Sequence, residues 1–395
     1  MNDLEDIMLK TVKEAELNGK DVLARVDFNV PIGKPDGNGE IDDDTRIKAA
    51  LPTIEYILQY GAKRLVLMTH VDPWDDIPPT TKDSRLKTDK IAQRLSDLLG
   101  INVTKVDDCV NIDLPETGVI MLENLRFHKG EKKDDPVFAG KIADLLPKHN
   151  RVYVNDAFGT CHRAHASVHA IVEHFDEAYA GLLLAKEVKY LGPVATNPRK
   201  PFYALLGGSK VSDKIQTIKN LSLKATKLFI GGRMALAFAN APGMDQEEAR
   251  YAQELIAKYG SKIVLPVDYK TDKGDIVPAN NLPKGAQFWD IGPKTVDLWK
   301  DQMDDAKTIF GNLVMGYIEK PGFDYATNQL ILYMADSDAT TIIGGGDSVK
   351  AVKKLIKKGQ IKEDSIDHIS TGGGASMEML EGKELPGLEA LGFYS

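Results

Sequence analysis

The chain has 395 residues, of which 43% are hydrophobic and 27% charged, and its formal net charge is −8 at pH 7. This length is too great for a single core and predicts two domains, while the negative charge argues against nonspecific nucleic-acid binding as the main task. The only cysteines are Cys109 and Cys161, which excludes a disulfide framework and a cysteine-rich zinc site.

The chain carries no targeting or membrane signal that we recognise. Residues 1–6 are acidic, unlike the basic start of a signal peptide or a transit peptide. No apolar run reaches the length of a membrane span. We therefore expect a cytoplasmic protein.

The first half alternates expected strands with expected helices. Apolar and β-branched runs predict the strands, and apolar residues spaced three and four apart predict the helices. In chain order these are a strand at 21–26, a helix at 46–58, a strand at 64–69, a helix at 87–99 stopped by Gly100, and strands at 119–122 and 151–154.

The second half repeats this alternation after a linker. A helical pattern covers 177–191, and Gly192-Pro193 and residues 197–201 then break the chain. Strands are expected at 202–206, 227–230, 262–265, 308–310, 340–343 and 368–370. Such alternation predicts α/β domains in which helices cover both faces of parallel sheets.

Residues 155–167 form the most informative segment of the first half. They read Asn-Asp-Ala-Phe-Gly-Thr-Cys-His-Arg-Ala-His-Ala-Ser and directly follow an expected strand. Open α/β sheets bind ligands at the carboxyl ends of their strands. An arginine between two histidines at that place predicts an anion site, because guanidinium and imidazole groups donate to anionic oxygens.

Arginine and glycine are distributed in opposite ways. Eight of the eleven arginines precede residue 164, whereas glycine clusters at 207–208, 231–232, 344–346 and 372–374 all lie in the second half. The guanidinium group of arginine binds phosphate and carboxylate groups through two parallel hydrogen bonds. The first half is therefore expected to bind a small molecule with several negative charges, and the second to bring its backbone close to a ligand.

The glycine clusters follow expected strands, where backbone N–H groups meet phosphate oxygens. Lys210 and Lys214 follow one cluster at a spacing that puts both on one helix face, if a helix begins there. Asp347 follows another, either as a helix N-cap or as a ligand of Mg²⁺ beside substrate phosphates. The sequence contains neither a P-loop nor a strand-linked dinucleotide fingerprint.

Taken together, these motifs resemble the phosphoglycerate kinase family over the whole chain. The matching segments are 25–31, 44–47, 122–127 and 155–167 in the first half, and 206–214, 290–295, 344–348 and 370–383 in the second. The resemblance implies two Rossmann-like domains with parallel sheets joined by a hinge helix. Residues 1–176 would bind 3-phosphoglycerate, 177–201 would form the hinge helix and linker, 202–384 would bind ATP or ADP with Mg²⁺, and the tail 385–395 would pack back on the first domain.

The resemblance also assigns roles to residues and implies a monomeric enzyme without nucleic-acid or membrane partners. The substrate site would contain Asp27, Asn29, Arg46, His70, Arg126 and Arg163. The nucleotide site would contain Lys210, Lys214, Asn312, Glu319, Gly344, Gly345, Gly346, Asp347 and Ser348, with Asp347 holding Mg²⁺. The groups acting on the transferred phosphoryl group would be Lys210, Arg46, Gly345 and Gly373. No catalytic base is needed, because the attacking substrate carboxylate is already ionised at neutral pH.

Two segments depart from the family pattern. The family usually has a Gly-Arg-Pro type loop after the histidine at position 70, whereas this chain lacks that arginine and places Asp72, Asp75 and Asp76 there. Leu313 and Val314 stand where the family commonly has Gly-Pro, and should add bulk beside the nucleotide. Two alternatives therefore remain: a kinase of the same fold for another phosphorylated carboxylate, and a catalytically weakened nucleotide-binding paralogue.

Overall fold

The structure is a computed structural model that describes residues 9–33, 40–72 and 84–394. The acidic start of the chain and the aspartates 75 and 76 lie outside these residues. The chain divides into two compact units: one runs to Lys189 and includes the chain from Glu384 onward, and the other is Tyr190–Lys383. The division falls inside helix α4 (Leu182–Ala195).

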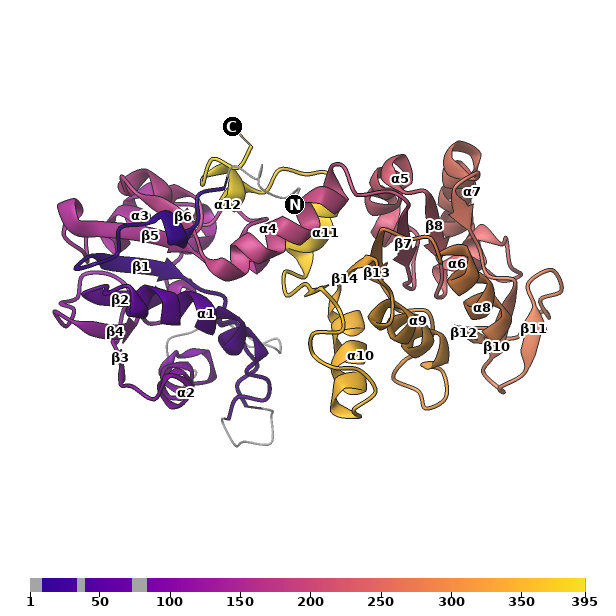
Figure 1. Ribbon diagram of the computed structural model, residues 1–395, viewed down its shortest axis with the longest axis horizontal. Helices are drawn as coiled ribbons and strands as arrows, with labels where there is room; N and C mark the ends of the chain where they lie inside the picture. Colours follow the sequence, from indigo (N-terminus) through magenta and orange to yellow (C-terminus); the bar gives the residue numbers. More distant parts are fainter. Residues whose placement is uncertain (1–8, 34–39, 73–83, 395) are drawn as a thin grey trace. The chain divides into compact units, whose positions relative to one another are not determined.

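The first unit is built on a parallel sheet of six strands in the order β3-β4-β2-β1-β5-β6 (Figure 1). Its strands are β1 (Asp21–Arg25), β2 (Arg64–Met68), β3 (Val103–Lys105), β4 (Gly118–Met121), β5 (Arg151–Asn155) and β6 (Ala178–Ala180). Its helices, besides the start of α4, are α1 (Thr45–Gln59), α2 (Asp89–Leu99), α3 (Pro136–Ala143) and the C-terminal α12 (Pro386–Glu389).

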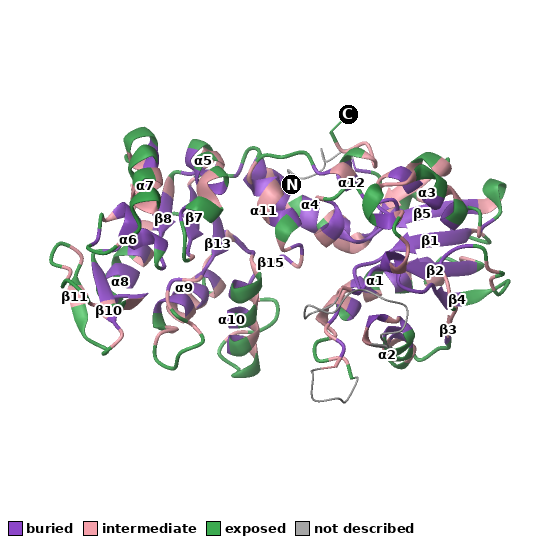
Figure 2. Ribbon diagram, turned by 180° about the vertical axis from the view of Figure 1, so that it is seen from behind, coloured by how far each residue is buried: buried purple, intermediate pink, exposed green. Residues whose placement is uncertain are grey.

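Alternate residues of these strands feed two separate cores, one on each face of the sheet. Val22 and Ala24 of β1 pack with α1 and α2, whereas Leu23 between them packs with α3. The same alternation continues through β2, β4 and β5, and Figure 2 shows these strands in the colour of buried residues. Successive side chains of a strand point to opposite faces, so a sheet covered on both faces needs continuous apolar runs.

The C-terminal segment belongs to the first unit. The Gly387 N–H donates to the Cys161 carbonyl at 2.9 Å, and a side chain on Gly387 would press against Val168. The hydroxyl of Tyr394 accepts a hydrogen bond from the Leu385 N–H at 3.0 Å. The contacts of Gly387 join this segment to the loop that follows β5, and the hydrogen bond of Tyr394 closes the segment on itself.

The second unit also has a six-stranded parallel sheet, in the order β15-β14-β13-β7-β8-β9. These strands are β7 (Phe202–Leu206), β8 (Lys227–Ile230), β9 (Ile263–Val264), β13 (Thr308–Asn312), β14 (Thr340–Ile343) and β15 (His368–Ile369). Strand order reverses between β7 and β13, which is the switch point where doubly wound sheets bind nucleotides.

A small antiparallel sheet and seven helices complete the described part of the second unit. The sheet has the order β11-β10-β12 and consists of β10 (Asp268–Thr271), β11 (Ile276–Pro278) and β12 (Phe288–Ile291). The helices are α5 (Ile215–Lys224), α6 (Met234–Phe238), α7 (Gln246–Tyr259), α8 (Pro293–Gln302), α9 (Tyr325–Ala335), α10 (Gly346–Lys357) and α11 (Gly374–Leu380).

The predicted α/β class and parallel sheets are confirmed, but three local predictions are wrong. Residues 178–180 form β6 rather than helix, because this segment pairs with the exposed edge of β5. Pro193 lies inside α4, in its last turns, where the helix tolerates the loss of one N–H donor. Lys210 and Lys214 do not share a helix, since α5 begins only at Ile215.

Helix α4 begins on the buried carboxylate of Asp156. Oδ1 of Asp156 accepts from the N–H groups of Leu183 and Leu184 at 2.9 and 3.2 Å. Burial raises the pKa of Asp156 to about 7, and the two N–H groups oppose this rise. Gly181 precedes the helix so closely that a Cβ there would overlap the Asp156 carboxylate.

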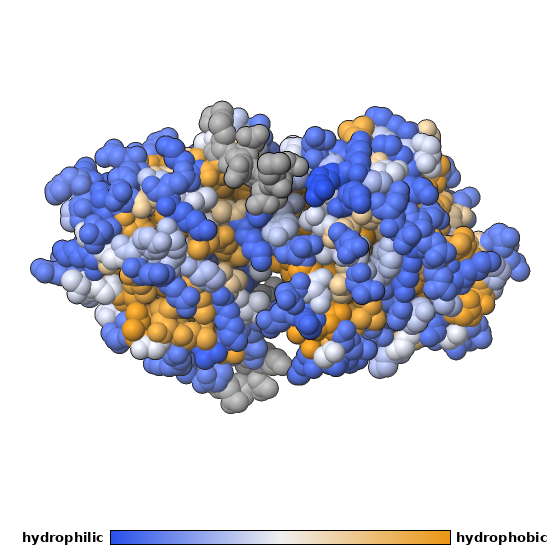
Figure 3. Space-filling model, viewed as in Figure 1, coloured by the Kyte–Doolittle hydropathy of each residue, from blue (hydrophilic) through white to orange (hydrophobic). Residues whose placement is uncertain are grey.

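Among the described residues, no helix is long and apolar enough to cross a membrane. Figure 3 shows mostly hydrophilic residues on the displayed face of each unit, interrupted by smaller apolar patches.

We predict that Gly181→Ala lowers the free energy of unfolding by about 1–3 kcal/mol, because the new methyl group displaces a buried carboxylate. Gly192→Ala in α4 is the matched control: its nearest neighbour would be Met379 Cε at 3.9 Å. An interior helical glycine replaced by alanine should leave stability unchanged or raise it by up to about 1 kcal/mol. Urea unfolding followed by circular dichroism tests both; equal midpoints for the two variants would contradict the prediction.

Candidate functional site

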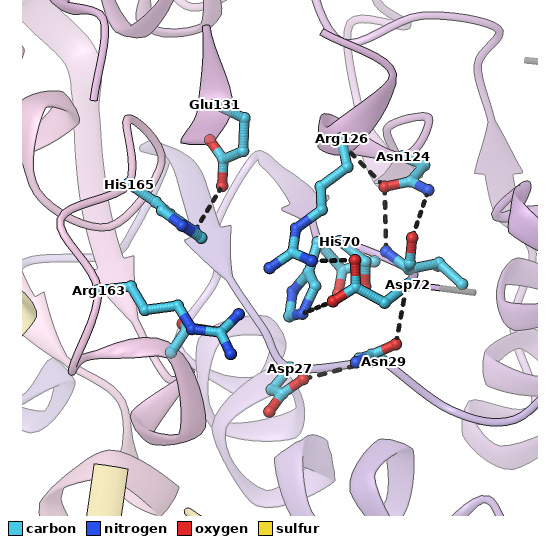
Figure 4. Close-up of polar contacts among 12 residues, drawn as sticks. Asp27, Asn29, His70, Asp72, Asn124, Arg126, Glu131, Arg163 and His165 are labelled. Atoms are coloured by element: carbon cyan, nitrogen blue, oxygen red, sulfur yellow. Dashed lines mark hydrogen bonds and ion pairs between the residues drawn. The ribbon is translucent and has the colours of Figure 1, made fainter. Parts of the chain in front are cut away.

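Most of the expected substrate residues of the first unit gather beyond the carboxyl ends of its central strands. Asp27 and Asn29 follow β1, His70 follows β2, Arg126 follows β4 and Arg163 follows β5. Figure 4 shows the side chains of Asp27, His70, Arg126 and Arg163 directed toward one region. The sheet thus brings together residues that are more than a hundred positions apart in the sequence.

A fully buried guanidinium lies beneath this region. Arg25 donates from Nε to Ser167 Oγ at 2.9 Å and from Nη1 to the Val26 carbonyl. Ser167 Oγ donates in turn to the buried Glu131 at 2.7 Å, and its N–H donates to the second oxygen of that carboxylate at 3.0 Å. A charge removed from water is tolerated only when it is paired and hydrogen-bonded, and this chain of contacts provides both.

Arg25 also fixes the state of His70. Its Nη2 lies 2.9 Å from Nδ1 of His70, and because arginine can only donate, Nδ1 accepts. Burial, followed by the charges of Arg25 and Arg126, holds the pKa of His70 well below its usual value. The ring is therefore neutral at pH 7 and carries its proton on Nε2, which lies 3.8 Å from Asp72 Oδ2.

Arg126 forms an ion pair with Asp72 through Nη1. Its side chain is only 3% exposed, and its Nε and Nη2 are buried without a hydrogen-bond partner among the described residues. The pKa of Arg126 is lowered by burial, and the neighbouring Asp72 opposes this effect. Buried N–H donors without acceptors cost free energy. Such donors are therefore expected where an anionic ligand binds and accepts hydrogen bonds from them.

Two further contacts complete the cluster. Arg46, from the first turn of α1, places Nη1 3.0 Å from both oxygens of Asp27. Asn29 donates its N–H to Asp27 at 3.3 Å, and its side-chain oxygen accepts from the Asp72 N–H at 3.0 Å. The positions of Asp27, Asn29 and Asp72 are therefore linked to one another by hydrogen bonds.

The segment after β5 contributes Arg163 and His165 from the opposite side (Figure 4). Arg163 is exposed, and its Nε donates to the ring of His162 at 3.1 Å. His165 is mostly buried, with Nδ1 4.0 Å from Glu131, and burial and the charge of Arg126 lower its pKa to about 4. The pattern of an arginine between two histidines pointed to this residue as an anion donor, whereas the family resemblance did not assign it to the substrate site.

In the second unit, glycines allow three strand ends to meet backbone to backbone. A Cβ on Gly207, after β7, would overlap the Val314 carbonyl, and a Cβ on Gly232, after β8, would lie 2.6 Å from the Gly208 nitrogen. The aliphatic part of Lys214 covers Gly208, and burial lowers the pKa of its ammonium group. Lys210 is exposed on the same loop.

Some of the other expected nucleotide residues have a structural role in the second unit, and others lie at its surface. Gly345 adopts a φ of 93° as the N-cap of α10, and a side chain there would press on the amide of Asn312. Ser348 is fully buried and its Oγ accepts from the Leu313 N–H at 2.7 Å. Gly373 caps α11 with a φ of 53°. Gly344 follows β14, and Gly346 begins α10.

A cavity of about 970 Å³ lies in the second unit. Its walls include Glu319, Val314 and the expected glycines 208 and 232, together with residues that the sequence did not single out: Leu236, Tyr269, Phe288, Trp289, Gly316 and Tyr317. Volume and aromatic lining suit a drug-sized ligand with a planar ring. Leu313 does not line it, because its side chain is fully buried beside Gly311. The expected added bulk therefore comes from Val314 alone.

Asp347 presents a carboxylate in the first turn of α10, where it pairs with Lys350 at 2.9 Å. A mixed group of Asp108, Cys109 and His128 also brings its ligand atoms within 4.8 Å of one another. There, however, His128 already pairs with Asp108 at 2.7 Å, and burial raises the pKa of the Cys109 thiol far above its usual value. Oxygen donors beside phosphates are what Mg²⁺ prefers, so Asp347 fits a magnesium ligand better.

The profile of the family described as phosphoglycerate kinase matches residues 12–383. The chain belongs to the phosphoglycerate kinase family.

Individual comparisons agree with this assignment. The chain is 43% identical to the phosphoglycerate kinase of Solibacter usitatus and 44% identical to that of Moorella thermoacetica, over 96% of this chain and 98% of each relative. Among solved structures, phosphoglycerate kinase from Coxiella burnetii superposes with a TM-score of 0.86 at 32% identity, covering 97% of this chain and 99% of that one.

Within this family, the loop after His70 is the notable departure. The chain has Asp72 where the family usually has glycine, and the structure turns that carboxylate toward Arg126 rather than toward solvent.

We predict that Ser167→Ala lowers the free energy of unfolding by about 1–3 kcal/mol, because Arg25 and Glu131 each lose a buried partner. Ser222→Ala is the control: Ser222 is 1% exposed, but its hydroxyl has no hydrogen-bond partner among the described residues. Its replacement should change stability by less than about 0.5 kcal/mol. Chemical denaturation of both variants provides the measurement, and a similar effect of the two would show that the bridge is not required.

Proposed function

We propose that this chain transfers a phosphoryl group reversibly between ATP and the carboxylate of 3-phosphoglycerate, with the first unit binding the glycerate and the second the nucleotide. The observation that carries the proposal is that Arg126, after β4, and Arg163, after β5, are directed toward one region in a chain of this family. 3-Phosphoglycerate carries a phosphate and a carboxylate, and these two anionic groups match arginine donors that lie on two sides of the site.

The substrate residues would act by binding and positioning. Arg126 and Arg163 would hold the anionic groups, His70 would donate from Nε2, and Asp27 and Asn29 would meet the hydroxyl and carboxylate end. Because the attacking carboxylate is already ionised, no residue needs to remove a proton. Catalysis then consists of alignment and of donors directed at the charge that develops on the transferred group.

On the nucleotide side, Glu319 and the cavity would receive the nucleoside, and Lys210, Lys214 and Asn312 would reach the phosphates. Gly344, Gly345, Gly346, Ser348 and Gly373 would contribute backbone donors, since the first N–H groups of a helix have no partner within it. Asp347 would hold Mg²⁺, which when bound neutralises charge on the nucleotide phosphates. Arg46 and Lys210 would stabilise the group in flight together with the backbone donors.

The same proposal includes the setting of the reaction. One chain supplies both sets of ligands, so we propose that it acts as a monomer. Membership of the phosphoglycerate kinase family supports an enzyme of glycolysis or gluconeogenesis, which we propose acts in the cytoplasm.

A coupled assay tests the function and separates it from the two alternatives. With ATP and Mg²⁺, 3-phosphoglycerate should give the highest kcat/KM in a panel of phosphorylated carboxylic acids. Preference for another acid would indicate a kinase with a different acceptor. Nucleotide binding without turnover of any acid would indicate a paralogue that has lost catalysis.

We predict that Lys210→Ala lowers kcat by at least about 100-fold while the dissociation constant of ADP changes by less than about tenfold. The reason is that an exposed lysine which follows the moving phosphoryl group acts mainly in the transition state. Lys219→Ala, an exposed lysine on α5, is the matched control and should leave both quantities unchanged. Steady-state kinetics and calorimetry give the two numbers; equal losses in both would reduce Lys210 to a ground-state phosphate anchor.

A further inference from the structure

Asp72 carries an inference that rests on the proposed function. Its carboxylate pairs with Arg126, and its other oxygen lies 3.8 Å from Nε2 of His70. These are two of the groups that would receive the anionic parts of 3-phosphoglycerate. The Asp72 carboxylate thus lies where an anionic group of the substrate is expected to bind (Figure 4).

The backbone that carries this carboxylate is held firmly. The Asp72 N–H donates to Asn29 Oδ1 at 3.0 Å, and the preceding Val71 exchanges two hydrogen bonds of 3.0 and 2.8 Å with the side chain of Asn124. Asn124 also accepts from the Arg126 N–H at 3.0 Å. The side chain of Asn124 therefore holds the backbone next to Asp72 and the backbone of Arg126. The fold itself brings the two charged residues together.

The carboxylate itself, in contrast, can leave. The side chain of Asp72 is 29% exposed, whereas that of Arg126 is 3% exposed. Rotation about the Asp72 side-chain bonds can move the carboxylate into water without disturbing the backbone contacts. Arg126 has no such freedom, and its buried Nε and Nη2 have no acceptor among the residues described.

The balance of charge shows what this pair does to ligand binding. Four guanidinium groups of the cluster, at positions 25, 46, 126 and 163, are accompanied by the carboxylates of Asp27, Asp72 and Glu131. His70 and His165 add no charge at neutral pH, because burial lowers the pKa of each. Among these guanidinium and carboxylate groups, one positive charge therefore remains in excess, whereas the substrate carries about three negative charges at neutral pH.

We propose that Asp72 is a specificity-determining residue that competes with the substrate for Arg126. A ligand that needs Arg126 must displace the carboxylate, and this weakens the binding of 3-phosphoglycerate equally in the ground state and the transition state. The competition should therefore raise KM and leave kcat nearly unchanged.

The test is Asp72→Asn, which removes the charge and keeps the size and the backbone contacts. We expect the dissociation constant of 3-phosphoglycerate, measured by calorimetry without nucleotide, to fall about tenfold. KM should fall in parallel, kcat should stay within about threefold, and ADP affinity should not change. Asp97→Asn, which removes an exposed carboxylate of α2 in the same unit, is the charge-matched control and should leave all four values unchanged.

Sulfate serves as a second probe that does not depend on the enzyme's substrate. The thermal midpoint of Asp72→Asn should rise more with sulfate than that of the parent, because Arg126 becomes available to an anion. If neither protein binds 3-phosphoglycerate but sulfate shows this difference, the proposed substrate is wrong and the competition stands. A folded variant that binds 3-phosphoglycerate and sulfate no better than the parent overturns the inference.

Discussion

The substrate side of this protein depends on one buried guanidinium. Arg25 connects the end of β1 to His70 after β2 and, through Ser167, to Glu131. Each of these groups would be costly to bury alone, and together they satisfy one another. The exposed arginines can be directed at a ligand because the residues beneath them are held by this network rather than by the ligand.

The two units solve the problem of anion binding in different ways. The first unit uses arginine side chains, whose guanidinium groups can form two parallel hydrogen bonds to a phosphate or a carboxylate. The second uses backbone, and the glycines 207 and 232 are required because strand ends β7, β8 and β13 meet without room for a Cβ. This contrast gives a structural meaning to the opposite distribution of arginine and glycine along the chain.

Much of the fold was predictable because buried parallel strands appear in the sequence as continuous apolar runs. β7, β8 and β14 were located to the residue, and helix α2 ends at Gly100 as expected, with a φ of 65°. The small sheet β10–β12 and the strand β6 escaped prediction, because short edge strands carry little periodic signal. Family resemblance located the arginines after β4 and β5, whereas the aromatic wall of the cavity comes from segments that no local pattern connects.

The orientation of single side chains was the part that sequence could not provide. Leu313 and Val314 are neighbours of similar chemistry, yet the first is fully buried and only the second lines the cavity. Asp72 looked like one of several acidic surface residues, and only the positions of Asn124 and Arg126 determine that it turns inward. A family motif fixes which residues are present, but the sign of the charge that a ligand meets depends on contacts between segments. In this chain, the contact between Asp72 and Arg126 means that an anion entering the site meets a guanidinium that is already paired with a carboxylate.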